Sequence, residues 1–343
     1  MNEHVYEAAV IGAGPIGLEM AIALKRAGID YVHFDARQIG YTISWFAPQT
    51  RFFSSNERIA IAGVPLFTPD QSKSTREQYL TYLRTVVEQF DLQIHTYEPV
   101  VNLEHKESIF KLTTRPAGGE RTWRAQRVIL VTGGTDRPRR IGCPGEDLPH
   151  VSHYFGDPHT YFRRRVLIVG GKNSAVEAAL RCHHVGAQVT LSYRRPELPD
   201  EHIKYWLVPE INGLIRSGRM SAYFGSTVKR ITPADVTLSL DDGSEKTLPF
   251  DVVLLLTGYE QDNALLKCAG IELCGECDVP TFNPQTMETK IPNLYVAGTA
   301  IGGTQEKYTV FIENCHEHVE RILRHAFGRE ADLHPVEVDA PES

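Results

Sequence analysis

A glycine-rich turn near the amino terminus has the residue types and spacing of a phosphate-binding loop. Gly12, Gly14 and Gly17 form the pattern Gly-x-Gly-x-x-Gly, and Pro15 and Ile16 lie between the last two glycines. The first glycine permits a tight turn, the second lets backbone approach a pyrophosphate, and the third allows a helix to pack on a strand. Unpaired N–H groups at the helix start would meet the negative charge, so these five residues are candidate binding residues.

An acidic residue follows this turn at the distance that dinucleotide binding requires. Asp35 ends the apolar stretch 31–35, where its carboxylate can accept hydrogen bonds from ribose hydroxyls. A lone Gly-x-Gly-x-x-Gly pattern is weak evidence, and a glycine turn without a ligand is the alternative. Here an apolar strand precedes the turn and a helix rich in Ala and Leu follows it, so the context favours a dinucleotide.

A second turn carries a related pattern, Gly-x-Gly-x-x-Ala, with one departure. Its residues, all candidates for cofactor binding, are Gly170, Gly171, Lys172, Asn173, Ser174 and Ala175. Lys172 occupies the place of the second glycine, where its side chain could crowd a pyrophosphate or swing out and pair with it. The residues themselves leave both possibilities open.

Two arginines, not an acid, follow the strand after the second turn. Arg194 and Arg195 come directly after the stretch 188–193. A guanidinium pair suits the 2′-phosphate of NADPH and leaves no acceptor for the ribose diol of NADH. An ordinary surface pair is the alternative, but the position at a strand end favours the cofactor.

Each turn requires a strand before it and a helix after it, and both are present in the sequence. Residues 6–35 and 166–193 each read as a βαβ unit about 30 residues long, the size of a dinucleotide-binding half. Apolar runs at 127–134, 251–258 and 293–298 fit central strands of parallel sheets. The sequence therefore predicts an α/β fold with two Rossmann-like, three-layer dinucleotide-binding domains.

Composition bounds the class of protein. The chain has 343 residues, enough for two domains, and its 42% hydrophobic and 23% charged residues are typical of a globular protein. A net charge of −7 argues against nucleic acid as a partner. No apolar stretch reaches the roughly 20 residues that span a bilayer, and the start lacks signal-peptide features. Six cysteines do not make a disulfide scaffold, so we expect a cytoplasmic protein without membrane contact or a bound metal.

The order of these motifs resembles the low-molecular-weight thioredoxin reductase superfamily over nearly the whole chain. Within it, four segments look like the YpdA family of bacillithiol disulfide reductases: Thr50–Ser55, His153–Phe155, Gly170–Ala175 and Phe311–Asn314. In that family a lysine in the second turn is normal. The resemblance implies FAD in the first domain, NADPH in the second, and reduction of a low-molecular-weight thiol disulfide. It also implies a small-molecule disulfide or a small redox carrier as the partner, and we expect a homo-oligomer.

The resemblance also places domains and further cofactor contacts. It implies an FAD domain formed by 1–146 and 263–343, with an NADPH domain of 147–262 inserted. Gly298 and Thr299 would lie along the ribityl-diphosphate of the flavin, and Gly258 is a further candidate cofactor contact. A helix that starts near Ile312 would point its amino terminus at the isoalloxazine and stabilise the reduced flavin.

The chain departs from these relatives at the positions that carry thiol chemistry. No Cys-x-x-Cys pair lies between Cys143 and Gly170, where thioredoxin reductases have one. Ile16 occupies the place of the proposed redox cysteine of the YpdA family, which excludes thiol chemistry there. Thr299 stands where many relatives have Asp. The catalytic residues are therefore left unassigned.

Other cysteines and histidines are candidates of lower rank. Cys274 and Cys277 form a Cys-x-x-Cys pair with the spacing of a redox dithiol, in a loop that we expect to be remote from the flavin. Zinc is not expected, because no second pair of ligands lies near them in sequence. Cys315, His316 and His318 could act as acid or nucleophile near the flavin, although packing is the more common role.

Three alternative functions stay open. A reductase of a protein carrier such as ferredoxin or flavodoxin needs no enzyme thiol. A flavin monooxygenase also carries two dinucleotide motifs, but its Phe-x-Gly-x-x-x-His signature fails here, because Cys143 replaces Phe and His150 lies one residue too far from Gly145. A flavin- or NADP-binding sensor with little turnover would explain the missing cysteines.

Overall fold

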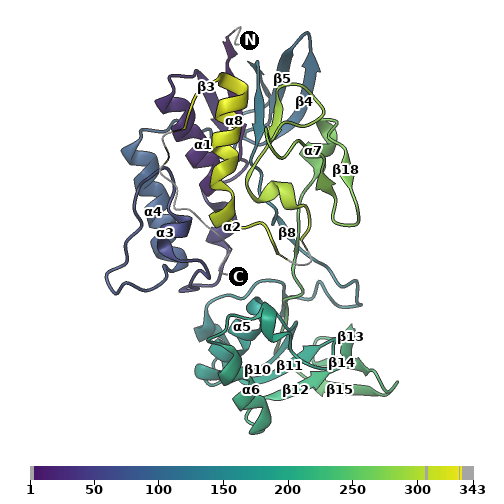
Figure 1. Cartoon of the computed structure of the whole chain (residues 1–343). Coiled ribbons are helices and arrows are strands. Elements are labelled where there is room, and N and C mark those ends of the chain that lie inside the picture. The colour runs from purple at the N-terminus through teal and green to yellow at the C-terminus, as the bar shows by residue number, and fades with distance from the viewer. Residues whose placement is uncertain (1–3, 306–307, 332, 334–343) are drawn as a thin grey trace. The chain divides into compact units, whose positions relative to one another are not determined.

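The chain forms two compact units (Figure 1). The structure is a computed structural model that describes residues 4–305, 308–331 and 333. Unit 1 comprises Met1–Trp45, Gln49–Arg137 and Glu260–Ser343, and unit 2 comprises Phe46–Pro48 and Pro138–Tyr259.

The unit boundaries differ from those expected from the sequence. They fall after 137 and 259, whereas the sequence placed them after 146 and 262. The Pro-rich segment that follows Arg137 packs within unit 2, where Ile231 N–H donates to the carbonyl of Pro144 at 2.8 Å. A Cβ at Gly145 would lie 2.0 Å from the carbonyl oxygen of Ile231, so this segment packs closely against the strand that ends at Ile231.

A four-stranded parallel sheet forms the centre of unit 1. Its strands, in spatial order, are β20 (Leu294–Val296), β7 (Val128–Leu130), β2 (Ala8–Ile11) and β3 (Tyr31–Phe34). Helix α1 (Pro15–Arg26) packs on β2 and β3, and α8 (His316–Phe327) lies beside α1, as Figure 1 shows in purple and yellow. Because all β2 residues are buried, this strand lies in the interior between two layers.

A second sheet and a short helix cover the other face of this parallel sheet. Apolar residues of the parallel strands share a core cluster with Leu103, Phe110, Leu112 and Leu266. The second sheet has the order β1 (Val5–Tyr6), β6 (Arg121–Ala125), β5 (Ile109–Thr114) and β4 (Val100–Lys106), and the helix is α7 (Ala264–Cys268).

Shorter elements complete unit 1. They are α2 (Tyr41–Ser44), α3 (Asn56–Ile59), α4 (Arg76–Gln89), the hairpin β18 (Leu273–Cys274) and β19 (Val279–Pro280), and the 3₁₀ helices η3 (Gly298–Gly302) and η4 (Ile312–Asn314). Helix α4 begins at a capping box in which Thr75 and Gln78 satisfy each other's backbone N–H groups. The strands β8 (Arg137–Pro138) and β17 (Tyr259–Glu260) lie where the chain passes from one unit to the other.

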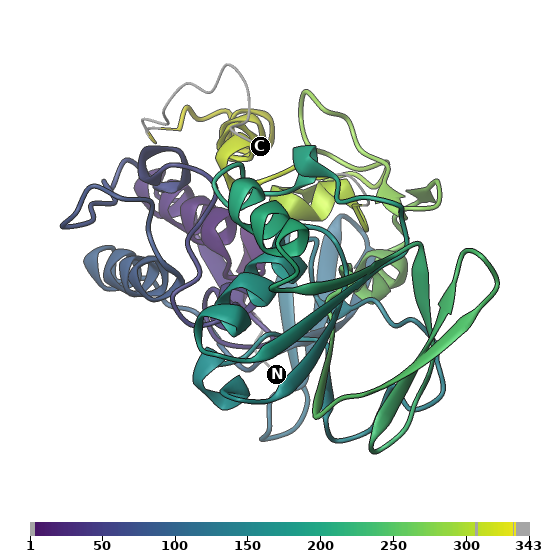
Figure 2. The ribbon, with the colours of Figure 1, turned by 90° about the horizontal axis from the view of Figure 1, so that it is seen from below.

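Unit 2 is built on a five-stranded parallel sheet. Its order is β12 (Ser221–Phe224), β11 (Gln188–Tyr193), β10 (Arg165–Val169), β16 (Val252–Leu255) and β9 (Val151–Ser152). Helices α5 (Asn173–His184) and α6 (Val208–Arg216) cover one face. The antiparallel sheet β13 (Ser226–Ile231), β14 (Asp235–Leu240) and β15 (Glu245–Pro249) covers the other, as the teal helices and green strands of Figure 2 show. The remaining elements are η1 (Pro158–Tyr161) and η2 (Asp200–His202).

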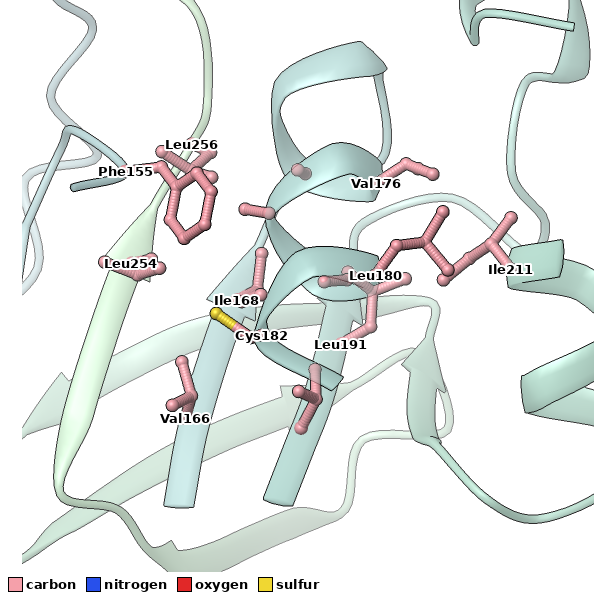
Figure 3. Packing of buried hydrophobic residues seen from close by; sticks show 14 of the residues in the cluster. Phe155, Val166, Ile168, Val176, Leu180, Cys182, Leu191, Ile211, Leu254 and Leu256 are labelled. Carbon is pink, nitrogen blue, oxygen red and sulfur yellow. The ribbon is translucent and has the colours of Figure 1, made fainter. Parts of the chain in front are cut away.

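Alternation along β10 explains these three layers. Val166 and Ile168 point toward α5, where they pack with Leu180 and Cys182 (Figure 3). Leu167 and Val169 belong instead to the cluster formed with the antiparallel sheet. Successive side chains of a strand point to opposite faces, so a strand covered on both faces reads as a continuous apolar run. This confirms the three-layer α/β fold expected from the sequence. In the described part of the chain, no helix has the length and apolar sequence needed to cross a bilayer.

Candidate nucleotide-binding sites

The first glycine turn connects β2 to α1 with the geometry that its sequence predicts. Gly12 has a φ of +114°, and a Cβ there would lie 2.2 Å from the carbonyl oxygen of Val131. A Cβ at Gly17 would lie 1.9 Å from the carbonyl oxygen of Gly12, so any side chain would push the helix off the strand. A Cβ at Gly14 would meet nothing within 4 Å. Gly14 therefore faces open space, which is what a closely approaching diphosphate needs.

The amino terminus of α1 is open to a ligand. Gly14 is its N-cap, no side chain caps it, and Pro15 occupies the first helical position. The first N–H groups of a helix have no partner within the helix and carry its positive dipole end. The first turn of α1 holds no acidic side chain that could offset this charge. The arrangement fits a diphosphate group, so the residues present fit the dinucleotide that the sequence predicts.

Asp35 follows β3 and contacts the glycine turn. Its carboxylate accepts hydrogen bonds from the N–H of Ala13 at 2.6 Å and from the N–H of Arg37 at 2.7 Å. Burial raises the pKa of Asp35, and the two backbone donors act in the opposite direction. A carboxylate offers about four acceptor positions, so two of them stay available for ribose hydroxyls.

His33 supports the same turn from below, a role that the sequence did not reveal. Its Nε2 lies 2.9 Å from the carbonyl oxygen of Gly12, to which it donates. The ring is fully buried, and this burial lowers the pKa of His33 to about 4. The neutral ring therefore holds the Gly12 carbonyl in place at physiological pH. An apolar strand that carries a single histidine is the signal that could have pointed to it.

Three loops meet at the carboxyl end of the parallel sheet in unit 1. Buried Gln261 donates both amide hydrogens, one to the carbonyl of Gly133 and one to that of Ala300, each at 3.0 Å. The N–H of Gly134 donates to the hydroxyl oxygen of Thr299 at 3.1 Å. Gln261 and Thr299 thus connect the loop after β7 to η3. Ligands of open α/β sheets bind outside this edge, so these loops lie where a nucleotide would be expected.

The predicted contacts at Ile16, Gly298 and Ile312 have different outcomes. Ile16 is 4% exposed, and a Cβ at Gly298 would lie 3.4 Å from the Cβ of Ile16, so the two segments are closely packed. A helical segment begins at Ile312, as expected, but its first turn is the 3₁₀ helix η4, and the α-helix α8 begins at His316. The Asn314 side chain accepts from the N–H of Phe311 at 2.9 Å and so caps the start of η4.

The start of α8 carries a buried ion pair. His316 Nδ1 lies 2.7 Å from Glu19 Oε2, and its Nε2 lies 2.9 Å from the carbonyl oxygen of Arg58. Both ring nitrogens face acceptors, so both carry hydrogen and the ring is an imidazolium. Burial opposes this charge, but the Glu19 carboxylate and the Arg58 carbonyl outweigh it and raise the pKa of His316. Glu19 also accepts from the N–H of Ala62 at 2.8 Å, so α1, α8 and the segment after α3 are joined at one point.

The two other candidates at the start of α8 have separate environments. Cys315 is fully buried, and burial raises the pKa of its thiol well above the usual range, which argues against a nucleophile. His318 Nδ1 accepts from the N–H of Gly298 at 3.2 Å, and burial lowers the pKa of His318 to about 4. His318 and Arg321 line a cavity of about 260 Å³. His318 therefore acts as a neutral acceptor that positions the first residue of η3.

The second glycine turn connects β10 to α5 in unit 2. A Cβ at Gly170 would lie 2.4 Å from the carbonyl oxygen of Leu256, and a Cβ at Gly171 would lie 2.6 Å from ring atoms of Tyr193. Only glycine fits at either position. Lys172 is the exposed N-cap of α5 and does not cap it through its side chain. The helix start is thus open, and a lysine is positioned beside it to meet a phosphate.

The remaining predicted residues of unit 2 differ in their surroundings. Asn173 Oδ1 accepts from the N–H of Lys204 at 2.6 Å, so this side chain holds a neighbouring loop. Ser174 is exposed and Ala175 is buried against Gly170. Gly258 follows β16 with a φ of +102°, and a Cβ there would meet nothing within 4 Å.

Arg194 and Arg195 lie just past the carboxyl end of β11. Both are exposed, and among the described residues neither guanidinium forms an ion pair. Two cations without acidic partners at this edge of a parallel sheet fit the 2′-phosphate of an NADP cofactor. The residues present therefore fit the phosphorylated dinucleotide better than its unphosphorylated counterpart.

All six cysteines lie in the described ranges, and all are free thiols. Within the same residues, no group of three or more His, Cys, Asp or Glu side chains could hold a metal ion. Cys274 and Cys277 lie in the β18–β19 hairpin, which contacts η3. The hairpin is therefore attached to the loop that contains η3, through the hydrogen bond from the N–H of Thr304 to the carbonyl of Cys277.

Comparison with known proteins agrees with this geometry. The family described as pyridine nucleotide-disulphide oxidoreductase matches residues 9–298. Bacilliredoxin reductase Bdr of Bacillus subtilis is 35% identical over 325 residues, which cover 94% of this chain and 98% of that protein. A ferredoxin–NADP reductase of Ignicoccus hospitalis is 26% identical over 300 residues, which cover 85% of this chain and 89% of that protein.

A solved structure extends the likeness to three dimensions. Bacillithiol disulfide reductase Bdr (YpdA) from Bacillus cereus superposes with a TM-score of 0.89 at 34% identity, covering 95% of this chain and all of that one (100%). These similarities confirm the identification of a thioredoxin reductase-like flavoprotein of the YpdA type, with FAD and NADPH as cofactors and oxidoreductase activity. The chain belongs to the pyridine nucleotide-disulphide oxidoreductase family.

Proposed function

We propose that this protein is an FAD-dependent NADPH oxidoreductase that reduces a low-molecular-weight thiol disulfide of the bacillithiol type. The observation that carries the proposal is the match to bacilliredoxin reductase Bdr, which extends over 94% of the chain at 35% identity. The two open helix starts, each preceded by a glycine turn that tolerates no side chain at its first residue, supply the physical basis.

In this proposal, unit 1 binds the flavin nucleotide. The turn Gly12–Gly14 and the start of α1 receive the diphosphate, and Asp35 receives the ribose hydroxyls. Gly298 and Thr299 would hold the remainder of the cofactor, and His33 and Gln261 keep the surrounding loops in shape. FAD, when bound, supplies the two-electron redox chemistry, and the protein supplies position and charge.

Unit 2 binds the nicotinamide cofactor and selects NADPH over NADH. The turn from Gly170 to Ala175 receives the diphosphate, with Lys172 as an added cation, and Gly258 leaves open space at the end of β16. Arg194 and Arg195 bind the 2′-phosphate. Hydrogen bonds to a charged group contribute about 1.5–3 kcal/mol each, which corresponds to roughly 10- to 100-fold in affinity.

An anaerobic titration tests the cofactor assignment. We expect NADPH to bleach the yellow protein at far lower concentration than NADH does. The double substitution Arg194→Glu and Arg195→Glu removes both guanidinium contacts and should reduce this preference by roughly 100-fold or more. Arg230→Glu is the matched control, because Arg230 is an exposed arginine of β13 in the same unit. An unchanged preference in the double variant would refute the assignment.

A substrate panel tests the electron acceptor. Steady-state NADPH oxidation should rise above the oxidase background when bacillithiol disulfide is added, and less with other small disulfides. The second candidate is a reductase of a protein carrier such as ferredoxin. The buried Ile16 at the thiol position favours it, as does the likeness to a ferredoxin–NADP reductase. Stimulation by ferredoxin or flavodoxin with none by any small disulfide would select that alternative. Size-exclusion chromatography of the same sample tests the expected homo-oligomer.

A further inference from the structure

The Cys-x-x-Cys pair lies in a hairpin of unit 1 whose strand β18 is labelled in Figure 1. Cys274 is the last residue of β18 and is paired across the hairpin with Val279. Gly275, with a φ of +70°, opens the four-residue loop that contains Cys277. Cys274 is exposed, Cys277 is half-buried, and both are free thiols. A short loop thus joins an accessible thiol to a more protected one.

Cys274 has a hydroxyl group and an ammonium group as polar neighbours. Its Sγ lies 3.2 Å from the hydroxyl oxygen of Thr281, which can donate a hydrogen bond to sulfur. The ammonium group of Lys290 is hydrogen-bonded to Glu272, which is the main cause of its raised pKa, and Cys274 raises that pKa to a smaller extent. The Cys274 side chain is therefore in a polar environment and not packed in an apolar core.

Acidic residues of the same hairpin are partly offset by their own partners. Asp278 is hydrogen-bonded to the amide of Asn263 and lies 3.5 Å from the ammonium of Lys267. Glu272 is paired with Lys290. Glu276 is exposed, so solvent screens its charge. Asp278 and Glu272 therefore each have a cationic partner of their own.

Backbone hydrogen bonds connect Cys277 to the proposed flavin site. The N–H of Thr304 donates to the carbonyl of Cys277 at 2.7 Å, and a Cβ at Gly303 would lie 2.2 Å from that carbonyl oxygen. The hydroxyl of Thr304 accepts from the N–H of Gln261 at 3.1 Å. Gln261 in turn holds the loop after β7 and η3 together. The hairpin is thus attached to the loops assigned above to the flavin.

We propose that Cys274 and Cys277 form a dithiol that exchanges with the small disulfide substrate, and that this pair supplies the thiol chemistry which Ile16 excludes at the first glycine turn. The inference rests on the proposed function. Cys274 is the attacking thiolate because it is the more exposed, and Cys277 is the resolving thiol because it is more protected and lies three residues away.

The exchange balances in two steps. The Cys274 thiolate attacks one sulfur of the disulfide, so the substrate S–S bond breaks, a mixed disulfide forms on Cys274, and the released thiolate takes a proton from solvent. The thiolate of Cys277 then attacks Cys274 Sγ and releases the second substrate thiol. The protein is left with a Cys274–Cys277 disulfide. Oxidation of one NADPH supplies the two electrons, and together with one solvent proton it supplies the two protons that restore the dithiol.

Thiol mapping tests this inference without relying on turnover. The holoprotein is exposed to a small excess of bacillithiol disulfide, alkylated, and digested. We expect the peptide that contains both cysteines to appear as an internal disulfide, and addition of NADPH before alkylation to restore two alkylated thiols. The Cys277→Ser variant should retain the substrate half as a mixed disulfide on Cys274, and the Cys274→Ser variant should retain none.

Kinetics with a matched control separate the inference from the proposed function. Both variants should lose at least tenfold in NADPH-driven disulfide reduction. Cys268→Ser should keep the wild-type rate, because Cys268 is an exposed thiol of the same unit outside the pair. Full disulfide reduction by both variants would overturn the dithiol and leave the proposed function intact. A wild-type protein that reduces ferricyanide with NADPH but no disulfide at all would overturn both.

Discussion

The buried histidine under the first glycine turn makes stability depend on pH in a direction that can be worked out. Burial lowers the pKa of His33 to about 4, whereas an unfolded histidine titrates near 6.5. Its contribution to stability is therefore complete above about pH 6.5, falls as the pH drops, and is lost at about pH 4. The full difference corresponds to about 3 kcal/mol, of which about 2 kcal/mol disappears between pH 7 and pH 5.

Two substitutions test this prediction. His33→Gln keeps a donor for the carbonyl of Gly12 but does not titrate, so from pH 7 to pH 5 it should lose about 2 kcal/mol less unfolding free energy than wild type. His33→Leu removes the donor and should cost about 1–3 kcal/mol at every pH. Urea unfolding, followed by hydrogen-exchange protection of peptides that cover β2 and β3, reports on unit 1 alone. His105→Gln, at an exposed histidine of the same unit, is the control.

The difference between the pH profiles of wild type and His33→Gln decides whether the His33 ring is neutral in the folded protein. All other titrating groups are shared by wild type and variant, so their contributions cancel in the difference between the two pH profiles. A difference below about 0.5 kcal/mol, the usual effect of a surface substitution, would refute the assignment of a neutral buried ring at His33.

Two further predictions concern helix α1 and its N-cap. Gly14→Ala should leave the thermal unfolding temperature of the apoprotein close to wild type while it weakens FAD binding, because its Cβ points into open space. Gly17→Ala should prevent stable folding of unit 1, since its Cβ would overlap the carbonyl of Gly12, and equal FAD retention by both variants would contradict this reading. Glu19→Gln should lower the unfolding free energy by about 3 kcal/mol near pH 6, because it leaves His316 charged and buried beside a neutral amide. Because the pKa of His316 is raised in the folded protein, its charged form contributes fully to stability below about pH 6.5, and this contribution is lost as the pH rises through the pKa of the folded state. Thermal melts should therefore show that the stability difference between wild type and Glu19→Gln becomes smaller in alkaline buffer. A difference that stays constant with pH would argue against an imidazolium at His316.

Local patterns were sufficient to predict the turns of both units. Gly12, Gly17 and Gly170 are each constrained by backbone atoms that come within 2.4 Å of a hypothetical Cβ, and that constraint is visible in sequence because only one residue type satisfies it. Asp35 and the two arginines after β11 could be placed in the same way, since each follows an apolar strand at a distance set by the βαβ unit.

Residues whose roles depend on distant segments could not be predicted. Gln261 donates to the carbonyl of Gly133, 128 residues away in sequence, and no local pattern marks a glutamine for that position. Glu19 and His316 are separated by 297 residues, so each reads as an ordinary polar residue of a helix until the two are seen together. The change from the 3₁₀ helix η4 to the α-helix α8 between Asn314 and His316 could not be predicted, because periodicity alone does not separate two helix types that follow each other.

The packing at Ile16 explains why thiol chemistry must be sought elsewhere in this chain. Ile16 fills the space beside Gly298, whose φ of +67° and missing side chain let η3 approach α1. A branched apolar side chain there makes the turn a purely structural and nucleotide-binding feature. The disulfide substrate then needs either a direct acceptor position at the flavin or a second thiol pair. Cys274 and Cys277 are close in sequence, Cys274 is exposed, and Cys277 is hydrogen-bonded to the segment that follows η3, so their substitution decides between these two mechanisms.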